Sequence, residues 1–414
     1  MHRFAFGSVV SLLIVSPLFS ADWFQFRGPE GDGHAESSKL PTEWSKTKNV
    51  TWRKELPGNG WSSPVVSEGK IYLTTAIPGE EKGDFSLRVI SLDASTGEIV
   101  WNKEVFEEVG KASPGIHSKN SHASPTAIVD GGQVFVHFGH MGTACLKASD
   151  GSIVWTNNTL KYSPVHGSGG SPVLVDDKLV FIIDGSDKQM VVGLDRMSGK
   201  VKWQTPRKTK AQKKFSFCTP LVISVSGQKQ VIAPGSDVMI SVDPKDGKEI
   251  WRLNYTGYSV VPKPVYANGL VYFSTGYDAP MFYAIRPNGK GDVTDTHVVW
   301  TAKKGAPHNP SPLVIDDAVY LISDGGVLTC LDGKTGEQRW NERVGGNYSA
   351  SPMYANGLIY LLAEDGTATV VKPGSSFEAV AKNKMGERAL ASYGVDGDAL
   401  LLRTEKALYR IEQK

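Results

Sequence analysis

The sequence predicts an all-β fold: an eight-bladed β-propeller of four-stranded blades, with the last blade closed by an N-terminal strand. Three observations predict it. A phrase that ends in Trp recurs along the chain, a second phrase with a Pro and a hairpin turn precedes each copy, and a segment near the N-terminus repeats the outer-strand part of the first phrase. The tryptophans lie roughly 40 to 54 residues apart, which is the period of a four-stranded blade.

The first phrase reads small–x–Asp–x–x–(Thr, Ser or Asp)–Gly–x–x–x–Trp, with Lys147 in place of the Asp in its second copy. The copies end at Trp101, Trp155, Trp203, Trp251 and Trp340, and a looser copy with an insertion ends at Trp300. The Gly allows a tight turn, and the Asp and Thr side chains can bond the turn backbone. We therefore expect a hairpin followed by the outermost strand, whose Trp packs against the adjacent blade.

The second phrase is a Ser, Thr or Lys before a Pro, followed by two apolar runs joined by a turn. Its dipeptides are Ser63-Pro64, Ser124-Pro125, Ser171-Pro172, Thr219-Pro220, Lys263-Pro264, Ser311-Pro312 and Ser351-Pro352. Turns such as Asn268-Gly269 supply the positive φ that tight hairpins need. Each repeat therefore reads as strand, hairpin, strand, link, strand, hairpin and strand. The blades start near Ser62, Ala123, Gly170, Thr219, Pro262, Ser311, Ser351 and Ala391.

The last two repeats depart from this pattern. The seventh has no Trp, and we expect Phe377 to substitute for it. The eighth, from Ala391 to Ile411, has room for three strands. Residues 49–56 resemble residues 98–105 around Trp101, so we expect Trp52 to lie on the fourth strand of the eighth blade. Such closure leaves no free sheet edge within the ring.

The chain divides into three segments. Residues 1–21 have a short polar start, an apolar stretch and small residues at the end, and they predict a secretory signal peptide. Residues 22–48 form an N-terminal leader segment, and residues 49–414 form the propeller. We expect an exported protein, periplasmic or extracellular. No later segment approaches about 18 uncharged apolar residues, so we expect no transmembrane span.

The net charge of +2 favours neither nucleic acid nor an anionic membrane as a partner. We expect a monomer that binds no nucleic acid. The three cysteines, Cys145, Cys218 and Cys330, are an odd count, which argues against a disulfide framework. Cys145 and Cys330 share one repeat position on opposite sides of the ring. A disulfide needs Cα atoms within about 7 Å, so we expect buried free thiols.

Residues 91–101, SLDASTGEIVW, resemble the tryptophan-docking motif of quinoprotein alcohol dehydrogenase propellers. The resemblance covers residues 49–414, and it extends to the pyrroloquinoline-quinone-like (PQQ-like) repeat proteins. The length and the single propeller look more similar to their outer-membrane protein assembly factor (BamB-like) branch. This resemblance implies a protein-binding or scaffold module without a recognisable catalytic site, whose partner is a protein or an envelope component. The alternative that it implies is a PQQ- and Ca²⁺-dependent quinoprotein oxidoreductase.

Quinoprotein dehydrogenases typically use a vicinal Cys–Cys disulfide, a Ca²⁺ site of Glu, Asn and Asp, and a catalytic Asp. This chain has no adjacent cysteines, and no such Glu–Asn–Asp set can be placed on its inner strand starts. We therefore expect no catalytic residue, no metal and no cofactor, with PQQ and Ca²⁺ as the alternative.

The loops that lead into the innermost strands converge at the mouth of the channel, where propellers bind ligands. The candidate binding residues there are Trp61, His122, His166, Phe217, His308, Asn309 and Tyr348. Aromatic and polar side chains around a mouth can grip a ligand or peptide, or they can plug the channel. A third hypothesis, a sugar-binding propeller or glycan lyase, rests on the fold and these aromatics. His117, His122 and His166 have no evident Asp or Cys ligands nearby, which favours hydrogen-bonded or solvated histidines over a metal site.

Two charged loops are also candidates. Arg207, Lys208, Lys210, Lys213 and Lys214 predict a solvated basic loop, with an anionic partner as the alternative. The loop from Asp184 to Asp187 lacks the full spacing of a Ca²⁺ loop, so it is a weak cation candidate.

Overall fold

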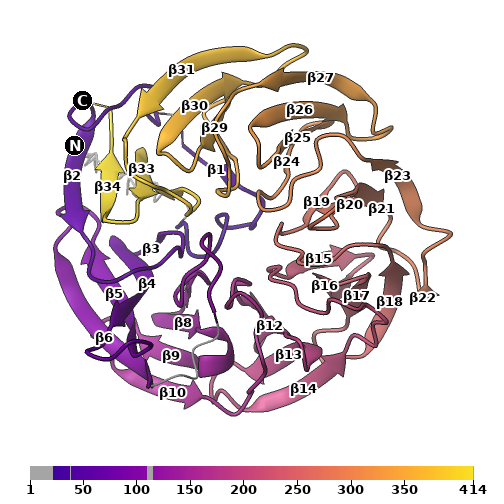
Figure 1. Cartoon of the computed structure of the whole chain (residues 1–414), viewed down its shortest axis with the longest axis horizontal. Coiled ribbons are helices and arrows are strands. Elements are labelled where there is room, and N and C mark those ends of the chain that lie inside the picture. The colour runs from indigo at the N-terminus through magenta and orange to yellow at the C-terminus, as the bar shows by residue number, and fades with distance from the viewer. Residues whose placement is uncertain (1–21, 38, 110–114, 414) are drawn as a thin grey trace, which may run out of the picture.

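A computed structural model describes residues 22–37, 39–109 and 115–413. The predicted signal peptide, residues 1–21, lies outside the described residues. The described part of the chain forms eight sheets around one axis (Figure 1), each with a core of four strands in antiparallel order. The prediction of an eight-bladed propeller is confirmed. Among the described residues, no helix is both long and apolar enough to cross a membrane.

Blades one to four follow the chain, each from its innermost to its outermost strand. Blade one has β3 (Val65–Ser67), β4 (Lys70–Pro78), β5 (Phe85–Asp93) and β6 (Ile99–Glu108). Blade two has β7 (Ile128–Asp130), β8 (Gln133–His137), β9 (Thr143–Lys147) and β10 (Ile153–Asn157), with the short helix η1 (Gly139–Met141) before β9. Blade three has β11 (Val173–Val175), β12 (Lys178–Asp184), β13 (Gln189–Asp195) and β14 (Val201–Pro206). Blade four has β15 (Leu221–Val225), β16 (Gln228–Gly235), β17 (Val238–Val242) and β18 (Glu249–Asn254), and β22 (Gly291–Asp292) adds to its outer edge.

The remaining blades complete the ring. Blade five has β19 (Val265–Ala267), β20 (Leu270–Ser274), β21 (Phe282–Ile285) and β23 (Val298–Ala302). Blade six has β24 (Leu313–Ile315), β25 (Ala318–Ile322), β26 (Val327–Asp332) and β27 (Gln338–Arg343). Blade seven has β28 (Met353–Ala355), β29 (Leu358–Leu362), β30 (Thr367–Lys372) and β31 (Glu378–Lys384), and β1 (His34–Ala35) joins its inner edge. Blade eight has β32 (Gly394–Asp396), β33 (Ala399–Arg403), β34 (Ala407–Ile411) and β2 (Val50–Glu55).

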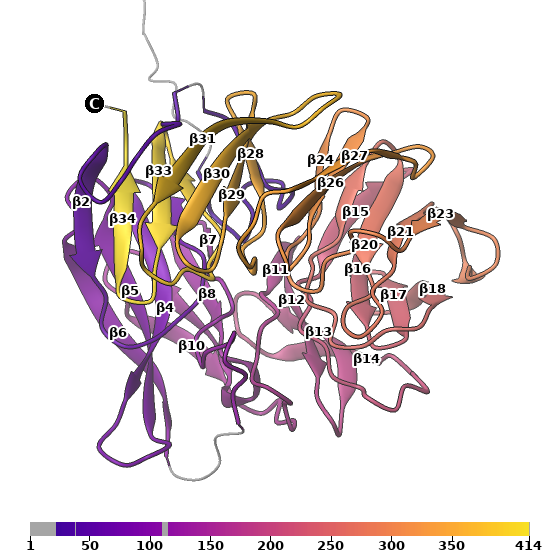
Figure 2. The ribbon, with the colours of Figure 1, turned by 45° about the horizontal axis from the view of Figure 1, so that its top comes forward.

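Blade eight is closed as the sequence predicts. Strand β2 pairs antiparallel with β34, and Trp52 lies opposite Arg410 in that ladder. Figure 1 shows β2 and β34 side by side although they come from the two ends of the propeller sequence. The blades differ in length, and Figure 2 shows β4, β5 and β6 of blade one extending beyond the ring.

The outer-strand tryptophans join neighbouring blades. The Trp52 ring lies against Gly97 of blade one, and its indole N–H donates to the carbonyl of Ala94 at 3.1 Å. Gly97 has φ +74°, and a Cβ there would come within 2.7 Å of the ring, so both backbone and space require Gly. The same indole-to-carbonyl bond joins Trp101 to Ala148, Trp155 to Arg196, Trp203 to Pro244, Trp251 to Pro287, Trp300 to Gly333 and Trp340 to Gly374.

The prediction that Phe377 replaces the missing Trp of blade seven is wrong. Ala381 occupies that register, opposite Val370 as Trp340 is opposite Cys330. Phe377 instead contacts the Trp340 ring at 6.0 Å. The reason lies in the closure: the outer strand of blade eight comes from the other end of the chain, so blade eight has no last hairpin on which a Trp of blade seven could pack.

The leader supplies the missing ring. Trp44 is 3% exposed and stacks on Tyr360 of β29, with ring centroids 6.4 Å apart. In blade six, Tyr320 and Trp340 make the equivalent contact at 5.9 Å. The Trp44 backbone N–H also donates to Asn383 of β31 at 2.9 Å. The leader therefore packs against blade seven as part of the propeller.

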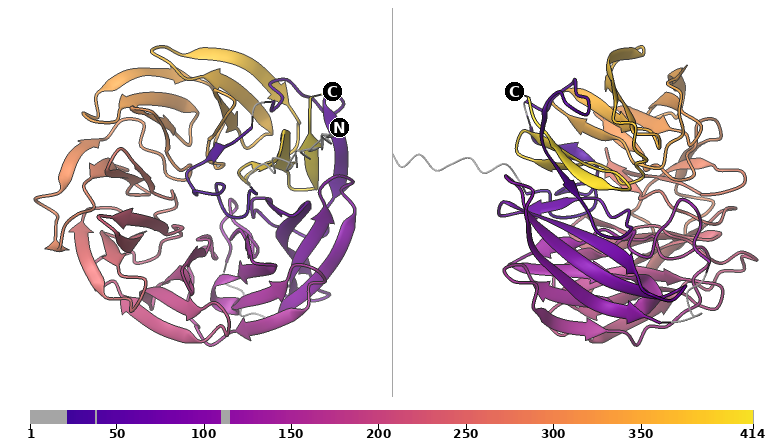
Figure 3. Two further views of the ribbon diagram at one scale, coloured as in Figure 1. Left: turned by 180° about the vertical axis from the view of Figure 1, so that it is seen from behind. Right: turned by 60° about the vertical axis from the view of Figure 1, so that its left-hand side comes forward.

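The first half of the leader crosses one end of the channel, as Figure 3 shows from behind. The backbone N–H groups of Val66 and Val129, in blades one and two, donate to the carbonyls of Trp23 and Phe24 at 2.9 Å each. On the other side, β1 pairs parallel with β28 of blade seven. These contacts reach the middle residues of β3 and β7 and the second and third residues of β28, so the leader closes the channel on the side away from the loops that lead into these strands.

The three cysteines, Cys145, Cys218 and Cys330, are buried and free, as predicted. Cys145 and Cys330 lie on the third strands of blades two and six, so the ring separates them.

Candidate functional site

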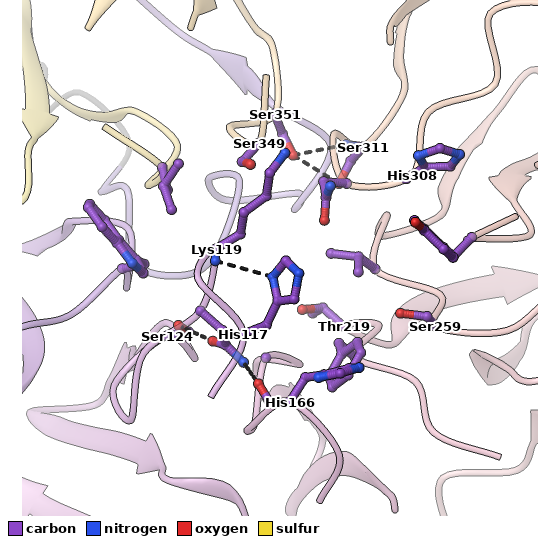
Figure 4. A pocket seen from close by; sticks show the side chains of 18 of the residues that line it. His117, Lys119, Ser124, His166, Thr219, Ser259, His308, Ser311, Ser349 and Ser351 are labelled. Atoms are coloured by element: carbon purple, nitrogen blue, oxygen red, sulfur yellow. Dashed lines mark hydrogen bonds between the residues drawn. The ribbon is translucent and has the colours of Figure 1, made fainter. Parts of the chain in front are cut away.

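The opposite face, where the innermost strands begin, holds a cavity of about 820 Å³ that we call the axial pocket. Its wall is built from the loops that lead into the innermost strands, and Phe26 of the leader also lies in its lining. Because one end of the channel is covered by the leader and the other holds the pocket, a ligand would enter from the loop face. Figure 4 shows side chains from many blades pointing into this space.

The floor of the pocket carries what we call the hydroxyl ring. Its members each lie two residues before the start of an innermost strand: Ser63, Thr126, Ser171, Thr219, Ser311, Ser351 and Ser392. The backbone N–H at this position donates to the hydroxyl of the next blade, from Ser63 to Thr126 at 2.9 Å and from Thr126 to Ser171 at 2.9 Å. The same bond recurs from Ser171 to Thr219, from Ser311 to Ser351 and from Ser351 to Ser392. The repeat thus explains why this position takes Ser or Thr: its oxygen satisfies a buried amide of the neighbouring blade.

Three blades depart from the pattern of a hydroxyl residue directly before Pro, and in blade eight the ring residue Ser392 precedes Tyr393. In blade two the ring position is Thr126, not Ser124, whose hydroxyl bonds Asn120 within the loop at 2.5 Å. In blade five the position is Lys263, which has no hydroxyl to accept the amide of Thr219. The Lys263 side chain is 3% exposed and lies so close to the leader that a Cβ on Gly31 would come within 2.0 Å of its Nζ.

One side of the wall is a row of contacting rings that we call the aromatic arc: His117, His166, Phe215, Tyr258, Tyr277 and His308. Centroid distances between consecutive rings run from 5.3 Å, for Tyr277 and His308, to 6.0 Å, for Tyr258 and Tyr277. All six line the pocket. Because each ring is held by its neighbours, the arc presents a preformed aromatic surface.

The other side of the wall is polar and charged. The Arg388 guanidinium lies over the Trp61 ring at 5.6 Å, and its Nη2 donates to the carbonyl of Ser118 at 2.6 Å. The Lys119 ammonium pairs with Glu364 at 2.8 Å. The loop that carries Ser118 and Lys119 therefore reaches from blade two across the pocket to the side of blades seven and eight, as Figure 4 shows for Lys119.

The structure brings five of the seven predicted site residues together in the lining of the pocket: Trp61, His166, Phe217, His308 and Asn309. The other two do not line it. His122 stacks on Phe85 at 4.0 Å and faces Glu108 at 3.3 Å, so it lies in a separate polar cluster. Tyr348 is 1% exposed and packs in the core between blades six and seven. Burial of its ring raises the pKa of Tyr348 to about 12.

Sequence reasoning missed much of the lining. Tyr258 and Tyr277 lie in the loops before and after the first hairpin of blade five, where an aromatic residue carries no repeat signal. His117 and His166 do meet, with centroids 5.5 Å apart, but His122 does not join them. Most of the hydroxyl ring had a usable signal, because all of its members except Thr126 and Ser392 stand directly before the Pro of the second repeat phrase.

The basic loop is not uniformly solvated. Arg207 is fully buried and its Nε donates to Asp184 at 2.8 Å, with neither side chain exposed. The Asp184 carboxylate is therefore already paired with Arg207, which makes it a poor ligand for a bound cation. Lys213 instead reaches the rim of the pocket, where its Nζ donates to the Tyr258 hydroxyl at 2.7 Å.

The donor set does not fit a Ca²⁺–quinone site. Ca²⁺ takes about six to eight oxygen ligands, several of them carboxylate. Asp324 is the one carboxylate in the described lining, and it accepts from the His308 backbone N–H at 2.7 Å and from the Asn309 side chain. No group of three or more His, Cys, Asp or Glu in the described residues is placed to hold a metal.

The chain matches a known protein family along most of its length. Its sequence matches the family described as outer membrane protein assembly factor BamB over residues 40–117, 88–321 and 289–375. The chain belongs to this family. BamB from Moraxella catarrhalis has the same fold, with a TM-score of 0.61, 14% identity, and coverage of 88% of this chain and 97% of that one.

Quinoprotein dehydrogenases share the propeller. A europium-containing methanol dehydrogenase superposes with a TM-score of 0.70 and 11% identity over 94% of this chain and 90% of that one. The dehydrogenase subunit of the quinone alcohol dehydrogenase of Gluconobacter oxydans (strain 621H) is 24% identical over 291 residues. That match covers 66% of this chain and 34% of the relative, so the chain spans about a third of it. These likenesses show that the chain shares the propeller fold of these proteins.

Proposed function

We propose that this protein is an exported binding or scaffold module that holds a protein or another envelope component at its axial pocket. The observation that carries the proposal is the asymmetry of the channel. The leader covers one end, and the other opens into a cavity of about 820 Å³ walled by loops from around the ring. A preformed concave site with mixed aromatic and polar walls is typical of a binding site.

The description of the family supports a binding role. The family is described as an outer membrane protein assembly factor, and a protein partner in the envelope is the simplest extension of that description to this chain. Asp324, the carboxylate in the described lining, accepts hydrogen bonds from His308 and Asn309. The quinoprotein oxidoreductase alternative requires a donor set that these residues do not supply.

Affinity capture tests the proposal. The tagged mature protein is incubated with an envelope extract of its own source, beside the double variant Phe215→Ala/Tyr277→Ala and the control Met197→Ala. Met197 is 65% exposed and does not line the pocket. We expect the wild type and the control to retain the same component, and the double variant to lose it. Equal retention by all three would place binding outside the pocket.

The oxidoreductase alternative has its own readout. The protein is mixed with PQQ and Ca²⁺, and the absorbance of the quinone and the reduction of an electron-accepting dye by alcohols or sugars are followed. We expect no bound chromophore after gel filtration and no dye reduction. A stoichiometric bound quinone with dye reduction would replace the binding proposal by the oxidoreductase.

A further inference from the structure

We propose that the axial pocket binds a neutral saccharide, such as the end of a glycan chain. This inference rests on the proposed binding function and names the class of its ligand. Three properties of the wall lead to it: a preformed aromatic surface, charges that are already paired within the chain, and a floor of hydroxyl groups.

The first property that favours a saccharide is the aromatic surface of the wall. The six rings of the aromatic arc follow one another along the lining, from His117 on the loop into blade two to His308 on the loop into blade six. Tyr277 is 53% exposed, and Phe215 and Tyr258 are half-buried, so parts of these rings remain open to a ligand. Sugar rings present apolar C–H faces that pack on aromatic rings, whereas an anionic ligand would gain little from such a surface.

The second property that favours a neutral saccharide is that the charged side chains of the lining have partners within the chain. Lys119 is paired with Glu364, and Lys213 lies over the Tyr258 ring at 4.2 Å and within 3.9 Å of Asp278. Asp324 is bonded to the backbone and side chain of its own loop. Each charged side chain of the described lining therefore has a partner before a ligand arrives. Because these partners already offset the charges, a neutral ligand loses little from the lack of a counter-charge.

The third property that favours a saccharide is the hydroxyl ring on the floor of the pocket. Ser63, Thr126, Thr219, Ser311, Ser351 and Ser392 line the pocket. Five of these oxygens accept one backbone N–H. The Ser351 hydroxyl also donates to Ser311 at 3.0 Å, whereas the O–H protons of Thr126, Thr219, Ser311 and Ser392 can serve another partner. A hydroxyl that can both donate and accept matches the hydroxyl edge of a sugar. Asn120 and Asn309 also line the pocket. The Asn120 amide already bonds His166 and Ser124, and the Asn309 amide nitrogen already donates to Asp324, so the Asn309 side-chain oxygen is the acceptor that they add.

The test uses an array of short neutral oligosaccharides, including glucans, xylan, mannan and chitin fragments, beside anionic polysaccharides and unrelated peptides. Binding of each hit to the full mature protein is then measured by titration calorimetry. We expect at least one neutral oligosaccharide to bind, with an affinity that changes less than about twofold between roughly 50 mM and 500 mM salt. Binding only to anionic glycans, or none to any neutral glycan, would overturn the inference.

Matched variants test whether a saccharide that binds does so at the aromatic arc. We expect Tyr277→Ala and Phe215→Ala each to weaken saccharide binding by about tenfold, because each removes one aromatic face. Tyr277→Phe keeps the ring and should bind within about threefold of the wild type, and Met197→Ala should be unchanged. Circular dichroism and thermal melting confirm that each variant is folded. A saccharide that binds equally to the two alanine variants would contradict the assignment to this pocket.

The outcomes separate this inference from the proposed function. If the array is blank but capture of an envelope protein depends on Phe215 and Tyr277, the saccharide is wrong and the binding module stands. If capture and array are both indifferent to these residues, both proposals fall.

Discussion

The ring of Trp44 stacks on the ring of Tyr360 with an interplanar angle of 15°. Trp44 belongs to the leader and Tyr360 to β29 of blade seven, so the contact joins segments more than three hundred residues apart in the sequence. It fills the gap that follows from closing blade eight with β2. The leader therefore completes the propeller at two places, under the pocket and beside blade seven.

Replacing Trp44 by Ala should destabilise the propeller. A buried Trp→Ala substitution typically costs about 3–5 kcal/mol, and the ring here is 3% exposed. Denaturant unfolding followed by tryptophan fluorescence and by circular dichroism measures the change. The control Met197→Ala should stay within about 0.5 kcal/mol of the wild type. A Trp44→Ala protein as stable as the control would show that the leader is not part of the fold.

Removing residues 49–56 should lower both stability and cooperativity, because it deletes β2 and exposes the edge of β34. Calorimetry should show a lower and broader melting transition. A shortened protein that melts like the parent would contradict the closure of blade eight by this strand.

Thr126→Val should cost about 1–2 kcal/mol, because it leaves the buried backbone N–H of Ser63 without its acceptor while keeping the volume of the side chain. Thr126→Ser retains the hydroxyl and is the matched control. The difference between the two variants in free energy of unfolding measures the hydrogen bond. Equal stability of Val and Ser at this position would mean that the hydroxyl ring contributes nothing to holding the blades.

Lys263 should make stability depend on pH above neutrality. Burial, followed by the nearby Arg27 guanidinium, lowers the pKa of its amine from 10.5 to about 7, and Asp32 opposes this. The unfolded chain binds the Lys proton up to about pH 10.5, whereas the folded protein loses it above about pH 7. Between these values the unfolded state holds more protons, so stability from this residue rises with pH by up to about 1.4 kcal/mol per unit.

Lys263→Met should remove that contribution. The variant is expected to be more stable than the wild type at pH 7, with the difference shrinking toward pH 10, as measured by denaturant midpoints across the range. The opposite trend, a wild type that gains relative stability as the pH falls, would mean that the Lys263 ammonium has an acidic partner in the folded protein.

Repeated local chemistry made much of the fold predictable. Each blade has the same strand order and packs against its neighbour in the same way, so the turn glycines, the Asn-Gly hairpins and the outer-strand Trp recur in the sequence. Trp52 belongs to the same pattern, which is why the closure of blade eight could be predicted. The prediction that Phe377 replaces the missing Trp was wrong because the position of an aromatic residue near a turn does not tell which blade the residue contacts.

The candidate site was predictable only where it belonged to the repeat. Trp61, Phe217 and Asn309 lie beside the repeated Ser–Pro phrase, so their place in the lining follows from the blade pattern. His122 and Tyr348 lie at similar positions in the sequence, but neither lines the pocket. His122 faces Glu108, and Tyr348 packs in the core between blades six and seven.

By itself, the sequence determined the number of blades, the closing strand and the free cysteines, because these depend on periodicity and on the position of a residue within its repeat. Only the tertiary structure decided that the leader covers one end of the channel, that Trp44 replaces a missing blade residue, and that six rings from separate loops form one arc. Those features are contacts between segments that do not repeat, and their geometry is set by how the ring brings distant loops together.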